Sequence, residues 1–535
     1  MIPEPKVEIG AAMSDVLAFL RTAEIDDEAR EQSEESAPYF LSQISDQAGI
    51  VYEKIRNAVD NKEEHFLRRY AIRRIAKRIM WFSDDPKVIT QGLLQDLYRG
   101  HYLSKASVTR LREEDVRRTI SAFLLLSAAV EASVSVTEFL QLRKYLLDIV
   151  AGAIEDRLYM THNEEASVRL LARITDDMWV TTGLTLDKSS RELVVYATAW
   201  RSLFAADSAL LLYKLWLVHY PNWENADTET LSGLAHVFPD FMTSAQGIID
   251  HDLGKRLQPR LRNCSIAVTV LYELLEHYDA GIETLIANRA DFEARIRAVV
   301  IEKYKQDISR ASRRAWQAII YIFATKTLLA VVVESLYLSV WKTSINYVAV
   351  ATNILFHPAM LFILTSGLAL PPKQNTDRLT LLVKDIVYGG PLPQIVLTPK
   401  RFGIISDIAL GLYVAVLGAT FAWISWTLLS LGFHYVDIAF FLVFLALVLY
   451  FGFRIRYAAR RMELTGAREG FLRSLAELFM LPIVSVGRWL VVRFERLNLI
   501  AIFMDFFIEI PLKLILQFFD TFSSVLKEKK DEIYS

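Results

Sequence analysis

The chain has 535 residues, enough for two or three domains. Its 60 basic residues nearly balance 62 acidic ones, so the net charge predicts nothing about partners. Its single cysteine, Cys264, excludes an internal disulfide framework and a metal site made of several cysteines. Hydrophobic residues make up 53% of the chain, a high share that comes from apolar runs after Arg314, whereas the charged residues crowd before it.

Residues 1–36 carry a run of acidic side chains with few core-forming residues, a composition typical of a poorly ordered arm. The first ten residues, MIPEPKVEIG, lack a basic stretch followed by an apolar core, so we expect no cleaved signal peptide. Entry into a membrane would then depend on internal apolar segments.

Helical patterns follow one another over residues 37–310, with few glycines and prolines between them. We predict a helical domain here, either a bundle or an irregular solenoid. If it forms two subdomains, the break lies near 160–165 or near 221–230, where polar and proline-containing connections interrupt the pattern.

One helix of this region, within residues 63–82, has basic rows beside an apolar stripe. The basic residues are Arg69, Arg73, Arg74, Lys77 and Arg78. The functional interpretation is a surface that docks on anionic lipid, and the alternative is a solvated face that pairs with the acidic arm. Aromatic residues do not interleave with these bases, so we expect no nucleic-acid partner.

The stretch His251-Asp252-Leu253-Gly254-Lys255 resembles the HD-x-G-K element of metal-dependent HD phosphohydrolases. In that family the His and Asp bind a divalent cation that activates water. The resemblance covers five residues, and the further His and Asp ligands have no well-placed counterparts. The alternative is a helix that ends with Gly254 as its C-cap. We therefore expect no enzyme, no metal and no cofactor, with His251 and Asp252 as remote catalytic candidates.

Four segments within residues 316–453 are long and apolar enough to cross a hydrocarbon core of ~30 Å, which needs roughly 20 helical residues. They are residues 319–340, 348–370, 408–431 and 435–453. Lys and Arg cluster before the first segment, between the second and third, and after the fourth, whereas the other two loops hold only Lys342. Positive charge marks the cytoplasmic side, so we predict a multi-pass plasma-membrane protein with both termini in the cytoplasm.

Polar residues in the first two segments are candidates for function, because an ionisable group inside a membrane is expensive. Lys326 and Glu334 lie eight residues apart on one helix, ~12 Å along its axis, so they do not pair. We expect Glu334 to reach Asn353 on the next helix, with His357 nearby, while Lys326 extends toward the cytoplasmic face. These groups form either an ion path or polar contacts that hold the two helices together, and we favour the second.

Residues 454–535 are predicted to form amphipathic helices and a charged tail on the cytoplasmic side. Residues 478–494 and 498–519 are apolar but carry charged stripes, so we favour helices that lie in the membrane interface over a further spanning hairpin. Residues 376–388 have the same amphipathic character. The fold class is therefore all-α: a helical cytoplasmic region joined to a transmembrane bundle with interfacial helices.

Three stretches resemble an uncharacterised multi-spanning membrane-protein family of reduced-genome bacteria. They are VYEKIRNAVDNKEEHFLRRYAIRRIAKR (51–78), the region from FATKTLLAVVVES to KQNTDRL, and FMDFFIEIPLKLILQFFDTFSSVLKEKKDEIYS (503–535). The resemblance implies a bacterial plasma-membrane protein and no known activity. We expect a membrane-anchored scaffold or adaptor with the bilayer and a protein partner or second copy as its contacts; the alternatives are a transport or channel component and, remotely, an HD-type phosphohydrolase.

Overall fold

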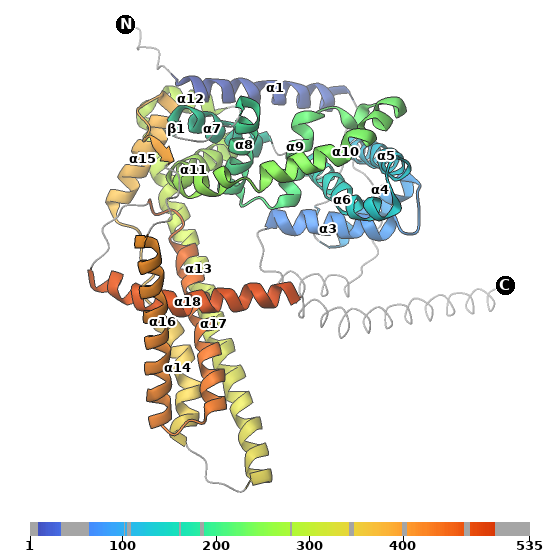
Figure 1. The fold of residues 1–535 in the computed structure, drawn as a ribbon. Coiled ribbons are helices and arrows are strands. Elements are labelled where there is room, and N and C mark those ends of the chain that lie inside the picture. The colour runs from blue at the N-terminus through green and yellow to red at the C-terminus, as the bar shows by residue number, and fades with distance from the viewer. Residues whose placement is uncertain are drawn as a thin grey trace, which may run out of the picture. The chain divides into compact units, whose positions relative to one another are not determined.

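The computed structural model describes residues 9–33, 64–100, 102–103, 109–159, 162–181, 187–278, 281–341, 347–397, 404–464 and 471–497. Within these ranges the chain is helical apart from turns and one pair of three-residue strands, which confirms the all-α prediction (Figure 1). It divides into two compact units. Unit 1 comprises Met1–Ile301 and Pro372–Lys400, and unit 2 comprises Glu302–Pro371 and Arg401–Ser535.

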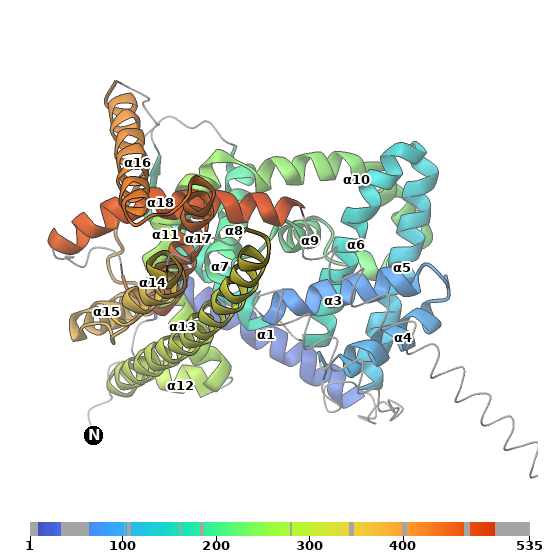
Figure 2. The ribbon, with the colours of Figure 1, turned by 90° about the horizontal axis from the view of Figure 1, so that it is seen from below.

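Unit 1 is a multilayer helical domain. Its elements are α1 (Ala11–Ser33), α3 (Glu64–Ile79), α4 (Pro86–Arg99), α5 (Arg110–Ser133), α6 (Val136–Tyr159), α7 (His162–Met178), β1 (Trp179–Thr181), α8 (Lys188–Phe204), α9 (Ser208–His219), η2 (Trp223–Asn225), α10 (Thr228–Ile249), α11 (Asp252–Tyr278), α12 (Ile282–Ala287), the start of α13 (Arg289–Trp341), α15 (Lys373–Tyr388) and β2 (Ile395–Leu397). Helix α6 packs against α3, α5 and α9, and α10 covers α5, α8 and α9 (Figure 2).

Several helices of unit 1 begin where a short polar side chain can cap the free backbone N–H groups. Asp85 accepts from the N–H of Lys87 and is followed by a proline in the first turn, and Thr109, Asp187 and Asp227 cap α5, α8 and α10 in the same way. The core between α9 and α10 contains a cluster of aromatic rings. The buried ring of Trp216 lies 5.0 Å from Phe241, centroid to centroid.

The prediction of a poorly ordered arm over residues 1–36 is wrong for residues 11–33, which form α1. Met13, Val16, Leu17 and Leu20 recur with helical spacing and are buried, and α1 packs against α7 and α15. The acidic residues that suggested disorder come later in the helix. A short apolar stripe at its start is therefore sufficient to dock α1 on unit 1.

Helix α15 follows the first apolar hairpin in sequence but belongs to unit 1. Its apolar face, formed by Leu379, Val383 and Val387, is fully buried, and it packs against α11 and α1. Two ion pairs join it to the start of α13: Arg297 to Asp377 at 2.5 Å and Lys384 to Glu293 at 2.7 Å.

The strand after α15 extends the same attachment. Residues 395–397 pair in parallel with residues 179–181, with Val396 opposite Val180. The expectation that residues 376–388 lie on a membrane surface is therefore wrong. The helix is present and amphipathic, but protein covers its apolar face.

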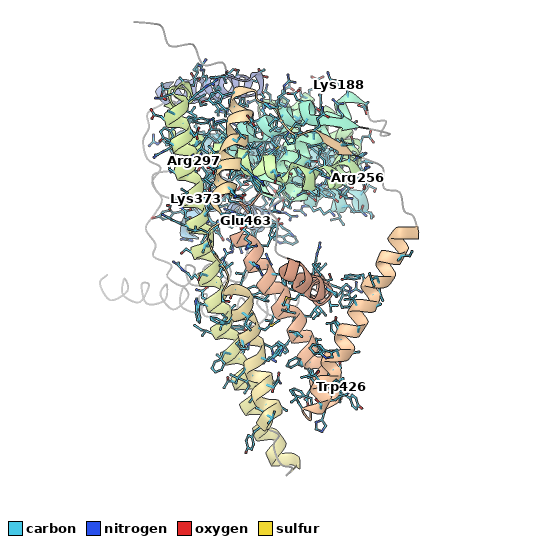
Figure 3. All side chains as sticks on the ribbon, turned by 90° about the vertical axis from the view of Figure 1, so that its left-hand side faces the viewer. Lys188, Arg256, Arg297, Lys373, Trp426 and Glu463 are labelled. Carbon is cyan, nitrogen blue, oxygen red and sulfur yellow. The ribbon has the colours of Figure 1, made fainter. Side chains whose placement is uncertain are left out.

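Unit 2 contains the continuation of α13 together with α14 (Tyr347–Thr365), α16 (Ile404–Ser430), α17 (Tyr435–Ala459) and α18 (Phe471–Leu497). Within the described ranges, three helices are long and apolar enough to cross a membrane: Tyr347–Thr365, Gly411–Ser430 and Tyr435–Ala459. The first expected span, residues 319–340, lies in α13, and its side chains from residue 328 onward are outside the described ones. Figure 3 shows Trp426 and Glu463 at opposite ends of these helices.

Helix α18 packs closely on α17 at a glycine. A Cβ atom on Gly487 would lie 2.1 Å from the carbonyl oxygen of Ala446 and 2.8 Å from Cβ of Tyr450. Ala446 follows Tyr435 by eleven residues, ~16 Å along the helix, so the contact lies inside the apolar stretch of α17. Residues 498–519 are outside the described ranges, and their placement at a membrane interface stays a prediction.

We expect Gly487→Ala to destabilise unit 2 by about 1–3 kcal/mol, because backbone atoms of α17 cannot move aside without separating the two helices. The matched control is Gly411→Ala on α16, where an added Cβ meets nothing within 4 Å. Thermal unfolding of the purified protein in detergent, followed by circular dichroism, measures both changes. Equal unfolding temperatures for the two variants would contradict the close contact.

Candidate functional site

A polar cluster lies among the apolar helices of unit 2, and Lys326 of α13 is at its centre. The Nζ atom of Lys326 donates to Oδ1 of Asn353 on α14 at 2.8 Å. It also lies 4.1 Å from the centroid of the Phe444 ring of α17, a cation–π distance. The lysine is only 6% exposed, so its charge is almost completely covered by protein.

His357 occupies the next turn of α14 and is fully buried. Its Nε2 atom lies 3.2 Å from the carbonyl oxygen of Phe441 on α17, and its Nδ1 atom lies 3.3 Å from the carbonyl oxygen of Asn353. The imidazole also packs edge-on against the ring of Phe441, with 4.6 Å between centroids. His357 therefore links α14 to α17, as Asn353 links α14 to α13.

Three of the four polar residues predicted for this site come together, but in a different pairing. Asn353 binds Lys326, whereas the sequence suggested Glu334, whose side chain is outside the described residues. The expectation that Lys326 extends away toward a membrane surface is wrong, since its head group is buried against α14.

The helix lengths explain the different pairing. Fifteen residues separate Lys326 from the end of α13 at Trp341, whereas only six separate Asn353 from the start of α14 at Tyr347. Helix α13 thus extends beyond α14 at their shared end. The sequence prediction of Glu334 assumed that residues at equal distances from the connecting loop lie opposite each other. This assumption fails here because the two helices extend to different lengths at that end.

A second set of buried charges lies in unit 1, between α3, α6 and α9. Arg69 pairs with Asp207 at 2.6 Å and lies 3.6 Å from Glu155, and Arg73 pairs with Asp148 at 2.9 Å. Arg69 is 3% exposed. The interpretation of this helix as a lipid-binding surface is therefore wrong for Arg69, and Arg73 is also engaged within the protein.

The remaining bases of that helix have different surroundings. Arg78 pairs with Asp96, and Arg74 interacts within the described part of the chain, while Lys77 is exposed. The predicted pairing with the acidic arm is replaced by carboxylates from α4, α6 and the N-cap of α9. A basic row on an amphipathic helix looks the same in sequence whether water, lipid or buried acids face it.

Burial raises the pKa of two acids in this set, Glu155 and Asp148. Loss of solvation raises the pKa of Glu155 to about 7, although Arg69 and Arg68 lower it. Burial likewise raises the pKa of Asp148 to about 6, against the effect of Arg73. No sequence pattern pointed to either acid, because their burial depends on how α3 packs on α6.

The five residues that resemble an HD element form the start of a helix. His251 precedes α11, and its Nδ1 atom accepts from the N–H of Leu253 at 3.2 Å, while Asp252 lies 3.8 Å from Arg256. The alternative of a helix ending at Gly254 is wrong, because α10 ends at Ile249 and Gly254 lies in the first turn of α11, against Thr198. Among the described residues, no group of three or more His, Cys, Asp or Glu could hold a metal ion.

Comparisons of the chain with protein-family models, with curated proteins and with solved structures find no match. The polar cluster of unit 2 is the stronger candidate site, because a buried cation among apolar helices requires a specific reason to be there.

A double-mutant cycle tests the cross-helix bond of the polar cluster. We expect Asn353→Leu to cost about 1.5–3 kcal/mol in the wild-type protein, since it removes the acceptor of a buried cation, and much less in a Lys326→Leu background. Thermal unfolding in detergent measures the four variants. Thr352→Val is the control, because that hydroxyl bonds within its own helix to Val348. Additive effects would argue against the bond.

The pH dependence of stability tests the buried acid of unit 1. The folded protein holds the Glu155 proton to about pH 7, against 4.5 for an ordinary glutamate, so stabilisation from this group is complete below pH 4.5 and is lost as pH rises through 7. We expect the unfolding temperature of Glu155→Gln, compared with that of the wild type at the same pH, to increase as the pH rises from 5 to 8.

The control for this pH series is Glu138→Gln, an exposed position on the same helix. Its unfolding temperature is expected to run parallel to that of the wild type across the same pH range. Fluorescence of the buried Trp200, Trp216 and Trp223 reports unfolding of unit 1. Parallel curves for Glu155→Gln and the wild type would contradict the raised pKa.

Proposed function

We propose that the protein is a membrane-anchored helical scaffold or adaptor of a bacterial plasma membrane, without catalytic activity, which holds unit 1 at the cytoplasmic face. One observation carries the proposal: the buried polar groups of unit 2 are engaged with one another and with backbone carbonyls. Lys326, Asn353 and His357 join three apolar helices. Groups arranged in this way hold helices together. Binding of partners would then be the role of unit 1.

The surface of unit 2 supports a position in the membrane. Helix α16 is largely exposed although it is apolar, with Leu412 at 66% and Trp423 at 67% exposure, as expected for a helix that faces lipid. Exposed Tyr435 and Tyr457 lie 22 residues apart on α17, ~33 Å along the axis. This spacing matches a hydrocarbon core of ~30 Å with aromatic residues at both interfaces.

The connectivity of unit 1 supports an even number of crossings. Residues on both sides of the first hairpin, 289–301 and 372–388, belong to one compact unit. The chain must therefore leave this unit and return on the same side of any membrane that it crosses. Helix α14 supplies one crossing, and residues 319–340 of α13 would supply the other.

The second hairpin supports the same topology. Arg461, after the end of α17, binds Asp307 of α13 at 2.9 Å. Asp307 precedes the apolar part of α13, so the exit of α17 and the entry of α13 lie at one end of unit 2. Basic residues gather at this end, among them Arg313, Arg314, Arg454 and Arg460, which favours its assignment to the cytoplasmic side.

A transport or channel role is the alternative, and one observation favours it. No carboxylate pairs with Lys326 among the described residues, so its partners are a neutral amide and an aromatic ring. A buried cation without a counter-ion is also found where ions or protons move through membranes. We place the scaffold first because each member of the polar cluster has a protein partner.

Reconstitution separates the two functions. We expect proteoliposomes with the purified protein to show proton and chloride fluxes equal to those of protein-free liposomes, with no change in Lys326→Gln. Affinity capture from native membranes is expected to recover a defined protein partner that depends on unit 1. The transport role would be favoured over the scaffold if the wild-type protein supports ion flux and Lys326→Gln abolishes it without a change in helical content.

A further inference from the structure

The charged end of α13 in unit 2 carries a pocket of about 590 Å³, which we call the α13 pocket. One row of its lining consists of Lys305, Ser309 and Arg313, at successive four-residue steps along the helix. Residues at this spacing lie one above another on one face, so the serine hydroxyl has a cation one turn away on either side. Each cation has a side chain long enough to reach toward that hydroxyl.

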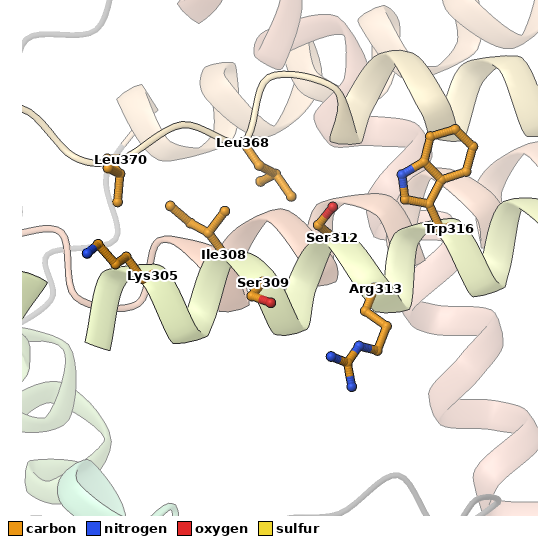
Figure 4. Close-up of a pocket in the computed structure, with 8 residues that line it drawn as sticks. All are labelled: Lys305, Ile308, Ser309, Ser312, Arg313, Trp316, Leu368 and Leu370. Carbon is orange, nitrogen blue, oxygen red and sulfur yellow. The ribbon is translucent and has the colours of Figure 1, made fainter. Parts of the chain in front are cut away.

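The second row of the lining is mostly apolar. It consists of Ile308, Ser312 and Trp316, and Figure 4 shows this row on the side of α13 that faces Leu368 and Leu370. Trp316 is half exposed, and its ring lies 5.9 Å from that of Phe362 on α14. The pocket therefore offers a cationic side and an apolar side along the same two turns of helix.

The cations of the pocket are free for a ligand. Within the described ranges, neither Lys305 nor Arg313 forms an ion pair, whereas Arg461 at the same end of unit 2 binds Asp307. An adjoining pocket shares Lys305, Ser309 and Arg313 and adds Arg310 and Arg314, with Glu302 as its one acid. The lining thus has a clear excess of positive charge.

We propose that the α13 pocket binds an anionic glycerophospholipid. The phosphate accepts from Ser309 and lies between Lys305 and Arg313, and an acyl chain follows Ile308 and Trp316 toward the apolar part of α13. Basic pockets beside membrane-spanning helices suit this ligand. The charged head group pairs with the cations while both keep most of their contact with water, and the acyl chain covers the apolar side of the pocket. The proposal rests on the membrane position proposed above.

The position of the pocket along the helix favours a lipid over a soluble phosphate. From Arg314 the sequence changes to the apolar run at Ile319 within five residues, ~8 Å of helix. Trp316 lies in this transition, where tryptophan is enriched at the boundary between head groups and acyl chains. A water-soluble phosphate would use the cations but leave the apolar row uncovered.

Binding is tested on the full-length protein purified in an uncharged detergent. Native mass spectrometry counts the molecules of phosphatidylglycerol or phosphatidylcholine retained at equal concentrations, and glycerol 1-phosphate serves as the soluble competitor. We expect the wild type to retain phosphatidylglycerol preferentially, and Lys305→Gln/Arg313→Gln to bind it roughly 30-fold more weakly. A single Arg313→Gln is expected to have an intermediate effect.

The matched control is Arg454→Gln, which removes one exposed cation from the same charged end of unit 2 but lines neither pocket. It is expected to bind phosphatidylglycerol as the wild type does, with unchanged helical content. The proposal is overturned if the wild type does not discriminate between the two lipids, or if Arg454→Gln loses as much affinity as Arg313→Gln. It is also overturned if glycerol 1-phosphate displaces the lipid at equal concentration.

A separate measurement distinguishes failure of the pocket from failure of the membrane position. If alkaline carbonate extracts the wild-type protein from native membranes, the proposed membrane anchor itself is contradicted. Wild type that stays in the membrane fraction but shows no lipid preference would leave the anchor intact and remove the lipid site alone.

Discussion

Helix α15 and strand β2 attach to unit 1 from beyond the first apolar hairpin, and the remaining topology depends on this attachment. Leu379, Val383 and Val387 are buried, and Arg297 and Lys384 add ion pairs to the same contact. A segment held in this way cannot lie across a membrane from the rest of its unit. Residues 289–301 and 372–388 therefore lie on the same side of any membrane that the segment between them crosses.

The buried Lys326 of unit 2 has partners of a different kind from those of the buried lysine of unit 1. In unit 1, the buried Lys214 pairs with Asp156 at 2.8 Å, and the partly buried Arg157 pairs with Glu224. In unit 2, Lys326 has an amide oxygen and an aromatic ring instead. A pair of opposite charges offsets the cost of desolvation but does little to fix how two helices align. A cation held by one amide requires a particular register of the two helices.

Much of the candidate site could be read from the sequence, and its pairing could not. Lys326, Asn353 and His357 are conspicuous as polar residues in apolar helices, so their importance follows from composition alone. That Asn353 binds Lys326 depends on α13 extending farther than α14, a property of two helices packed together. Glu155 gave no signal at all, because its unusual protonation arises only when α3 covers it.

The sequence by itself determined the helical class, the apolar helices of unit 2 and the polar residues that cap the start of several helices, because spacing, length and capping are local properties of the chain. Only the tertiary structure decided what each amphipathic helix faces. Residues 64–79 and 373–388 both have the pattern expected at a lipid surface, yet Arg69 meets buried acids and Val383 meets protein. An apolar or basic stripe has the same periodicity against lipid, water or another helix, so the pattern cannot name the partner.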